Sequence, residues 1–231
     1  LLYSRFWNKF LKDIGVAKFD EPFKRLRNQG MILGADNRKM SKRWGNVVNP
    51  DDIVKTYGAD TLRVYEMFMG PFEASLPWST ENIIGSRRFI EKVWRLRELK
   101  VESKKLKSDR NNDSHLESVI HRTIEKVTRD IQTFSFNTAV SALMIALNEM
   151  EKSDMVPFEL FSMFLTLMHP FAPHVTEELW NTLGKKTLLA NEMWPKADAK
   201  KMKSTFVKIV VQINGKVRGT IEIPIGGDQH D

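Results

Sequence analysis

Cysteine is absent from the 231-residue sequence. Its absence excludes disulfide bridges within these residues and metal sites built on thiolates. A metal site would then need histidine and carboxylates, but the five histidines show neither a His-x-x-x-His spacing nor a paired His and carboxylate spacing. They are His115, His121, His169, His174 and His230. We therefore predict no metal site in this chain.

Long apolar runs and leader-like patterns are also absent. No segment approaches the roughly 20 apolar residues that a helix needs to cross a bilayer. No charged stretch followed by an apolar run ends in a small-residue cleavage site. We therefore expect a soluble, cytoplasmic protein without a membrane partner.

Charge of both signs is plentiful, with a modest basic excess. The chain has 36 Lys and Arg against 29 Asp and Glu, which gives a net charge of +7. Such an excess suits a polyanionic partner, although proteins that bind no polyanion also carry it. The length allows one good hydrophobic core or two modest ones.

A short polar loop, residues 38–46, reads Arg-Lys-Met-Ser-Lys-Arg-Trp-Gly-Asn. It follows an apolar run, 31–33, that predicts a strand, and precedes Asn49 and Pro50, which are typical of a helix start. Its lysines, Lys39 and Lys42, are compact point charges on flexible stems, which could close on a polyphosphate. The alternative is an ordinary solvated basic turn.

The order of residues in this loop resembles the K-M-S-K-S signature of class I aminoacyl-tRNA synthetases, together with the Gly-Asn-Val-Val-Asn-Pro that follows it. The resemblance implies an ATP-binding loop that comprises Lys39, Met40, Ser41, Lys42 and Arg43. It also implies that Lys42, and secondly Lys39, are catalytic and stabilise charge on the leaving pyrophosphate, with loop closure as the gate. Two positions depart from the pattern, because Arg43 replaces a serine and Trp44 replaces a frequent lysine.

Hydrophobic periodicity predicts a mainly helical chain. Helices are expected near 1–14, 23–30, 49–57, 60–69, 79–96, 116–131, 137–150, 158–168 and 175–183. The polar stretch 104–114 has no apolar period and is expected to be a mobile connection. Alternation over 207–213 and 217–223, with Asn214-Gly215 between them, predicts a β-hairpin.

Two predicted helices carry basic residues at matched spacing on their polar faces. The rows are Arg88, Lys92 and Arg95, then Arg122, Lys126 and Arg129. They could straddle a nucleic-acid backbone, or they could be solvated faces. We expect His169 and His174, which flank a Pro-Phe-Ala-Pro corner, to be structural.

Further stretches are similar to the bacterial-type leucyl-tRNA synthetases. They are Glu21-Pro22-Phe23-Lys24 with Gln29-Gly30-Met31, residues 57–63, residues 173–180, and residues 210–218. Residues 57–63 are shared with the isoleucine, valine and methionine enzymes. The resemblance implies the end of a Rossmann-like α/β catalytic domain at 1–47, a stem-contact unit at 48–78, a helical anticodon-binding bundle at 79–200, and a hairpin at 201–231 that begins a further domain.

The resemblance also implies the ligands of the full enzyme and a limit on the activity of this chain. ATP, leucine and tRNA(Leu) are the expected ligands of the full enzyme, with Mg²⁺ accompanying ATP, and a monomer is expected. No His-x-Gly-His motif occurs, so the other half of the ATP site is missing and the chain should not activate leucine alone. Because the sequence begins at Leu1 inside an apparent helix, we expect a fragment rather than a subunit of a split enzyme. The alternatives are a non-catalytic helical RNA-binding module, or the same fragment of an isoleucine, valine or methionine enzyme.

Overall fold

The computed structural model describes residues 1–101, 110–202, 206–213 and 216–224, and it is mainly helical as predicted. The α-helices in these ranges are α1 (Leu2–Asp13), α2 (Pro50–Tyr57), α3 (Ala59–Phe68), α4 (Thr80–Lys100), α5 (Arg110–Thr133), α6 (Phe136–Lys152), α7 (Phe158–Met168) and α8 (Pro173–Thr182). The strands are β1 (Ile32–Leu33), β2 (Leu76–Pro77), β3 (Phe206–Ile213) and β4 (Lys216–Pro224), and the short 3₁₀ turns are η1 (Lys42–Trp44) and η2 (Leu189–Asn191).

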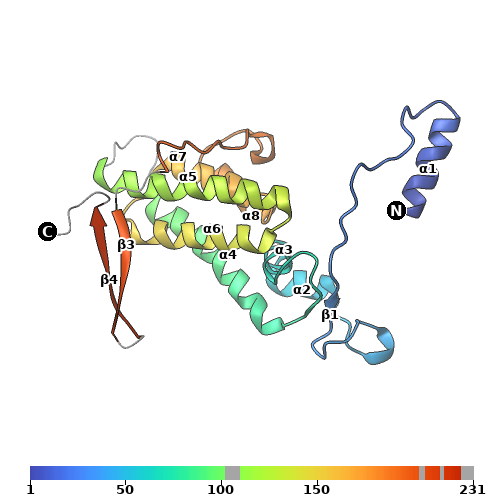
Figure 1. Ribbon diagram of the computed structural model, residues 1–231, viewed down its shortest axis with the longest axis horizontal. Helices are drawn as coiled ribbons and strands as arrows, with labels where there is room; N and C mark the ends of the chain where they lie inside the picture. Colours follow the sequence, from blue (N-terminus) through green and yellow to red (C-terminus); the bar gives the residue numbers. More distant parts are fainter. Residues whose placement is uncertain (102–109, 203–205, 214–215, 225–231) are drawn as a thin grey trace.

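Helices α4 to α8 form a bundle around the larger of two hydrophobic cores (Figure 1). Helix α5 packs along α6 and α7, whereas α4 packs on α6 and α8. Phe161, Phe164 and Leu165 of α7 are fully buried, so α7 is central, as its nearly continuous apolar sequence predicted. Ala139 and Ala146 of α6 are also fully buried, and their small side chains suit close approach of the neighbouring helices.

A second, smaller core lies where α2, α3 and the start of α4 meet. Tyr65 and Trp78 form its centre with ring centroids 5.1 Å apart in an edge-to-face arrangement. The Tyr65 hydroxyl also accepts the backbone N–H of Ser79 at 3.0 Å, which satisfies its polar atom. Ser79 in turn caps α4 by accepting the Asn82 N–H. This core therefore joins the short helices to the bundle.

Strand β1 pairs in parallel with β2, which the sequence analysis did not predict. The pairing begins at Gly30, whose N–H donates to the Phe72 carbonyl at 2.8 Å. A Cβ at Gly30 would lie 1.9 Å from the Ala74 carbonyl oxygen, so only glycine allows this approach. The loop that follows β1 is thereby fixed to the helical body.

The predicted helix at 23–30 was wrong, because these residues form no helix. A helix of about two turns is marginal without a core to cover its apolar face, and Phe23 and Leu26 are exposed. Arg27 is held elsewhere: its guanidinium donates to the Thr133 carbonyl at 2.7 Å and stacks on Phe134. The segment is instead an extended strap that crosses to the turn between α5 and α6.

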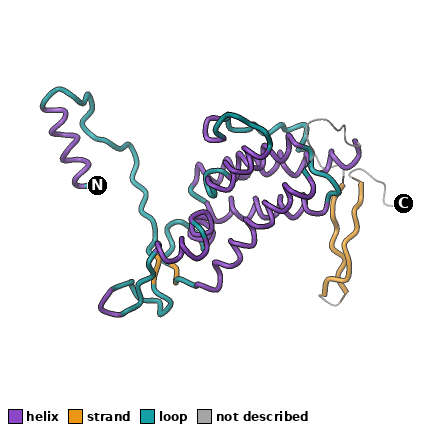
Figure 2. Tube along the Cα trace, turned by 180° about the vertical axis from the view of Figure 1, so that it is seen from behind, coloured by secondary structure: helices purple, strands orange, loops and turns teal. Residues whose placement is uncertain are grey.

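The predicted connection at 104–114 was also partly wrong, because α5 begins at Arg110. Residues 104–109 lie outside the described residues. Helix α1 forms as predicted, but Leu2, Phe6 and Phe10 on its apolar face are exposed. It lies away from the other helices, with the hairpin at the opposite end of the molecule (Figures 1 and 2).

The C-terminal hairpin follows the predicted pattern. β3 and β4 pair antiparallel from Phe206 opposite Pro224 to Ile213 opposite Lys216, with one register shift between Val211 and Gln212. The predicted turn, Asn214-Gly215, lies outside the described residues. Among the helices of the described ranges, none has the length and apolar character needed to cross a membrane.

A tertiary cap joins α3 to the bundle. Asp60 is buried, and its carboxylate accepts the N–H groups of His174 and Val175 in the first turn of α8, at 3.3 and 2.6 Å. His174 Nδ1 lies 2.7 Å from the same carboxylate. Ala172, the residue at the N-cap of α8, offers no side-chain acceptor. Asp60 therefore performs the capping that the local sequence lacks.

We predict that Asp60→Ala lowers the free energy of unfolding by about 2 kcal/mol, because two N–H groups in the first turn of α8 lose a charged acceptor. Asp52→Ala is the matched control, since Asp52 lies exposed in the first turn of α2, and we expect a loss of under about 0.5 kcal/mol. Urea unfolding of the two variants measures the difference. Equal losses would show that Asp60 is no tertiary cap.

Candidate functional site

The loop after β1 turns back on itself immediately. The N–H of Gly34 donates to the Arg38 carbonyl at 2.8 Å, and Leu33 forms an antiparallel bridge with Lys39. Asn37 has a φ of 60°, a left-handed conformation that asparagine tolerates better than most residues. The chain therefore returns to the end of β1 at Lys39, the first of the predicted ATP-binding residues.

Asn46 closes the base of the loop. Its side-chain oxygen accepts the Ser41 N–H at 2.8 Å, and its amide donates to Asp36 at 3.0 Å and to the Lys39 carbonyl at 3.4 Å. The Asn46 hydrogen bond, with a second from the Arg38 N–H, lowers the pKa of the Asp36 carboxyl below its ordinary value. The side chain of Asn46 therefore connects the end of the loop to Asp36, which precedes it, and to Lys39 and Ser41 within it.

Two of the five predicted loop residues have structural roles. Met40 is partly buried against the smaller core, where it anchors the loop. Ser41 caps η1, because its hydroxyl accepts the Arg43 N–H at 3.2 Å. Gly45 ends η1 with a φ of 64°, in the left-handed region that favours glycine. Met40 anchors the loop and Ser41 and Gly45 shape its turn. The side chains of Lys39, Lys42 and Arg43 therefore face solvent.

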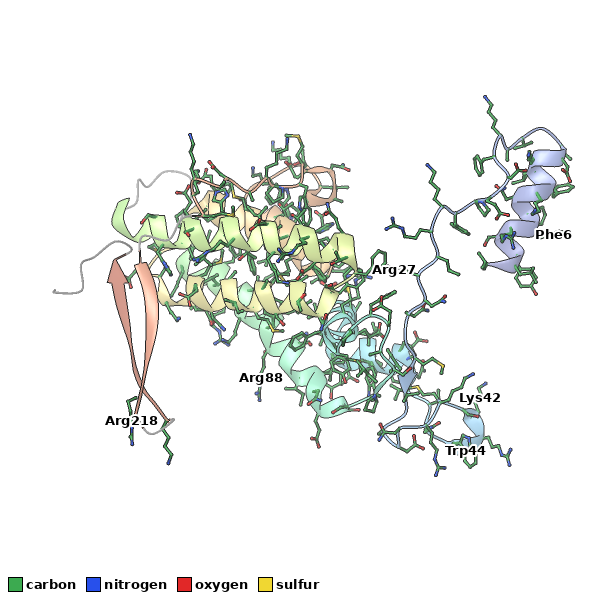
Figure 3. All side chains as sticks on the ribbon, in the orientation of Figure 1. Phe6, Arg27, Lys42, Trp44, Arg88 and Arg218 are labelled. Atoms are coloured by element: carbon green, nitrogen blue, oxygen red, sulfur yellow. The ribbon has the colours of Figure 1, made fainter. Side chains whose placement is uncertain are left out.

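The cations of the loop are exposed. Lys39, Lys42 and Arg43 are all exposed, and within the described ranges none forms an ion pair with a carboxylate. Figure 3 shows Lys42 and Trp44 projecting from the loop at the lower right of the view. Three unpaired cations on a loop anchored by Met40 form a surface that suits a polyphosphate.

The two basic rows lie on helices that do not pack closely against each other. Helix α4 carries the first row and α5 the second, and α6 packs against both of them. The two rows therefore lie on helices that both pack against α6, and their contact with a nucleic-acid backbone stays a prediction. Arg88 projects from the solvent side of α4 (Figure 3).

The six residues of these rows differ in their partners. Lys92 forms a salt bridge with Glu151 at 2.7 Å, and Lys126 pairs with Asp130 one turn away. Arg122 donates to the Ser118 carbonyl. Arg88, Arg95 and Arg129 are exposed, and among the side chains that the structure describes they have no acidic partner. These three arginines are available to a polyanion, and Arg122, which is exposed and bonded only to a backbone carbonyl, can add to them.

A cleft that the sequence analysis missed opens beside the first row. It has a volume of about 650 Å³ and lies between the α2–α3 turn, α4 and the start of α8. Trp94 and Arg95 line one wall, and Asp60 and His174 line the other. The acids in it are engaged: Glu91 pairs with Arg87, and Glu98 accepts the Trp94 indole N–H. No sequence pattern predicts the cleft, because its walls come from three separate segments.

The described residues also contain no group of three His, Asp or Glu side chains that could hold a metal ion. His169 and His174 are bonded within the fold, since His169 Nδ1 lies 2.9 Å from the Thr176 hydroxyl and His174 faces Asp60. The candidate site is therefore the cationic loop together with the exposed arginines of the bundle.

Comparison with known proteins gives two family matches. Residues 3–78 match the family described as tRNA synthetases class I (I, L, M and V), and residues 113–230 match the anticodon-binding domain of tRNA ligase. The second match alone covers half of the chain.

Two solved structures are similar to the chain. A LeuRS of Agrobacterium radiobacter, solved in a ternary complex with tRNA and LeuAMS, is 34% identical over 99% of this chain, with a TM-score of 0.76. The chain spans 32% of that LeuRS. The methionyl-tRNA synthetase of Mycobacterium tuberculosis, solved with methionyl-adenylate, is 18% identical over 78% of this chain and 41% of its own, with a TM-score of 0.55. At this identity the second likeness concerns the fold alone.

We predict that Asn46→Ala opens the loop without unfolding the protein, because three hydrogen bonds at its base are lost. Trypsin should cleave after Arg38, Lys39, Lys42 or Arg43 about tenfold faster, since cleavage follows local opening. The melting temperature should change little. Asn181→Ala, at an exposed position of α8, is the control. Unchanged cleavage in the loop would contradict the role of Asn46.

Proposed function

The chain belongs to the class I tRNA synthetases of the isoleucine, leucine, methionine and valine group, and we propose that it is part of a leucyl-tRNA synthetase. Such a ligase uses ATP to activate leucine as leucyl-adenylate and transfers the leucyl group to tRNA(Leu). The observation that carries the leucine assignment is the 34% identity to a LeuRS over 99% of the chain. The leucine-type stretches at 21–24, 29–31 and 210–218 agree with it. We place this ligase in the cytoplasm as a monomer.

The loop would contribute to the activation step. The leucine carboxylate attacks the α-phosphorus of ATP, and the bond to the bridging oxygen breaks as pyrophosphate leaves with the electron pair. Lys42 and Lys39 would place positive charge beside this developing negative charge. Their exposure and lack of carboxylate partners among the described residues support the role, because an ammonium already paired would have to be released first.

Mg²⁺ is expected to arrive bound to the triphosphate of ATP. The loop itself offers cationic groups to a polyphosphate, and its one carboxylate, Asp36, is engaged by Asn46 and Arg38. The residues of this loop therefore suit the phosphates of ATP and not the metal ion, and we assign no ligand of Mg²⁺ in this chain.

This chain would not activate leucine by itself. It spans about a third of the LeuRS that it resembles, with 32% of that chain covered, and the His-x-Gly-His half of the ATP site is not among its residues. The leucine pocket and any editing site would lie in the remainder of the enzyme.

The bundle would hold tRNA(Leu) chiefly through its phosphates. Arg88, Arg95 and Arg129 are exposed on two separate helices, a pattern suited to contacts along a backbone rather than to reading one base. Lys92 and Lys126 already have acidic partners and would add less. Phosphate contacts of this kind position the tRNA without specifying its sequence.

A second candidate is a non-catalytic RNA-binding module in which the loop is one more phosphate contact. The observation that favours it is that the loop cations and the bundle arginines are alike exposed and without acidic partners in the described structure. Lys42 separates the two candidates, because only the catalytic role requires it specifically for adenylate formation. A parent enzyme for isoleucine, valine or methionine remains a third alternative, and the amino-acid pocket decides it.

We predict that Lys42→Ala in the full-length enzyme lowers the rate of leucine-dependent ATP–pyrophosphate exchange by about 10²- to 10³-fold, because a charge needed in the transition state is lost. The dissociation constant for tRNA(Leu) should stay within about twofold. Lys55→Ala, an exposed lysine of α2, is the control. Comparable losses of exchange and of tRNA affinity would favour the RNA-binding module instead.

For the bundle, we predict that Arg88→Gln lowers the slope of log affinity for tRNA(Leu) against log salt by about one, since one phosphate contact releases about one counterion. Lys92→Gln, one turn further along α4, should leave the slope unchanged because Glu151 already holds its ammonium. Binding across a salt series measures both slopes. An unchanged slope for Arg88→Gln would make this arginine part of a solvated face.

A further inference from the structure

Trp44 contacts two arginines of the loop. The guanidinium carbons of Arg38 and Arg43 lie over its indole at 5.4 and 5.3 Å from the ring centroid. The side chain is 56% exposed, so its ring is not buried in a core and has no packing role there. An exposed indole in a loop instead contacts two cations, which would otherwise repel each other.

The guanidinium N–H groups of both arginines have no hydrogen-bond acceptor among the described residues, where only the backbone N–H groups of Arg38 and Arg43 donate. These guanidinium N–H groups can therefore donate in pairs to phosphate oxygens. Neither guanidinium forms an ion pair with a carboxylate in the described ranges. The nearby Asp36 is held by Asn46 and by the Arg38 backbone N–H.

We propose that Trp44 is a positioning residue that holds Arg38 and Arg43 as a guanidinium pair for the polyphosphate, beside Lys39 and Lys42. The proposal rests on the proposed function, because it assumes that the loop binds a nucleoside triphosphate. It adds Arg38 and Trp44 to the loop's binding residues, which the sequence signature did not assign. The indole fixes two flexible side chains before the ligand arrives and so lowers the ordering cost of binding.

The first experiment uses the chain itself and inorganic tripolyphosphate as the probe, with the dissociation constant measured by calorimetry. Trp44→Ala should raise this constant about fivefold, whereas Trp44→Phe, which keeps an aromatic face, should stay within about twofold. Trp7→Ala is the matched control, because Trp7 of α1 is 58% exposed and lies outside the loop. It should leave binding unchanged.

A double-mutant cycle tests whether Trp44 acts through the arginines. Arg43→Ala should raise the dissociation constant for tripolyphosphate in the otherwise unchanged chain. The same substitution should raise this constant by a clearly smaller factor in the Trp44→Ala background. Additive losses would mean that Trp44 and Arg43 act separately, which overturns the positioning role. Failure of the unchanged chain to bind tripolyphosphate, or equal losses for Trp44→Ala and Trp44→Phe, would overturn it as well.

The second experiment uses the full-length enzyme and separates this proposal from the proposed function. Trp44→Ala should raise the KM for ATP about fivefold and leave kcat for exchange within about twofold, because the arginines bind the ground state as well as the transition state. A fall in kcat at unchanged KM would contradict the proposal. If the unaltered enzyme shows no leucine-dependent exchange, the proposed function fails, and the tripolyphosphate cycle still decides the role of Trp44.

Discussion

The parallel pairing of β1 with β2 is the constraint on which the position of the loop depends. It begins with the hydrogen bond from Gly30 to Phe72 and is possible only because Gly30 has no side chain to strike Ala74. From there the chain reaches the loop within a few residues, and Met40 returns to the smaller core. The loop therefore has two fixed points, the strand before it and the partly buried Met40 within it, while the cations on either side of Met40 are left in solvent. A polyphosphate site requires this combination, because cations buried without partners would be costly and cations on an unanchored loop would have to be ordered on binding.

The same constraint connects the loop to the bundle. Segment 70–78 carries β2 and Trp78 and leads directly into α4, so the strand that holds the loop is continuous with a buried residue of the smaller core. Three long-range bonds reinforce this connection: Arg27 to the Thr133 carbonyl, Arg63 to the Pro170 carbonyl, and Asp60 to the first turn of α8. Each joins a residue before α4 to the bundle, and each ends on a backbone group at a turn or helix end. Such groups lack partners within their own helices. The units thus complete each other's hydrogen bonding, so that ligand contacts on the bundle and at the loop act on one connected framework.

The sequence predicted the parts of this structure that follow from local pattern. The bundle helices have strong 3.6-residue periodicity, and the caps Asn49 and Ser79 accept the N–H groups expected of them. It failed where a distant contact overrides the local preference. The pattern of residues 23–30 predicts a helix. However, Arg27 donates a hydrogen bond to the α5–α6 turn and Gly30 donates one to the segment before β2, so these residues are extended. Strand β2 is two residues long and has no periodicity of its own, and the cleft beside Trp94 needs three segments to be brought together. The loop cations were predictable from their order in the signature, but the contact of Trp44 with Arg38 was not, because it depends on how tightly the loop turns.

The loop and the bundle present cations to phosphates in two different ways, and the difference follows from their partners. On the bundle, acids neutralise part of each basic row: Glu151 holds Lys92 and Asp130 holds Lys126. A partly neutralised row gives moderate, salt-sensitive attraction, which suits a large ligand that must also dissociate.

In the loop, an indole takes the place of an acid beside Arg38 and Arg43. An aromatic ring orients a guanidinium without cancelling its charge, whereas a carboxylate would do both. A cluster built in this way keeps its full charge for a small, densely charged ligand. The neighbouring Asp36 forms no ion pair with either guanidinium among the described residues, and it accepts hydrogen bonds from Asn46 and from the Arg38 backbone that shape the loop.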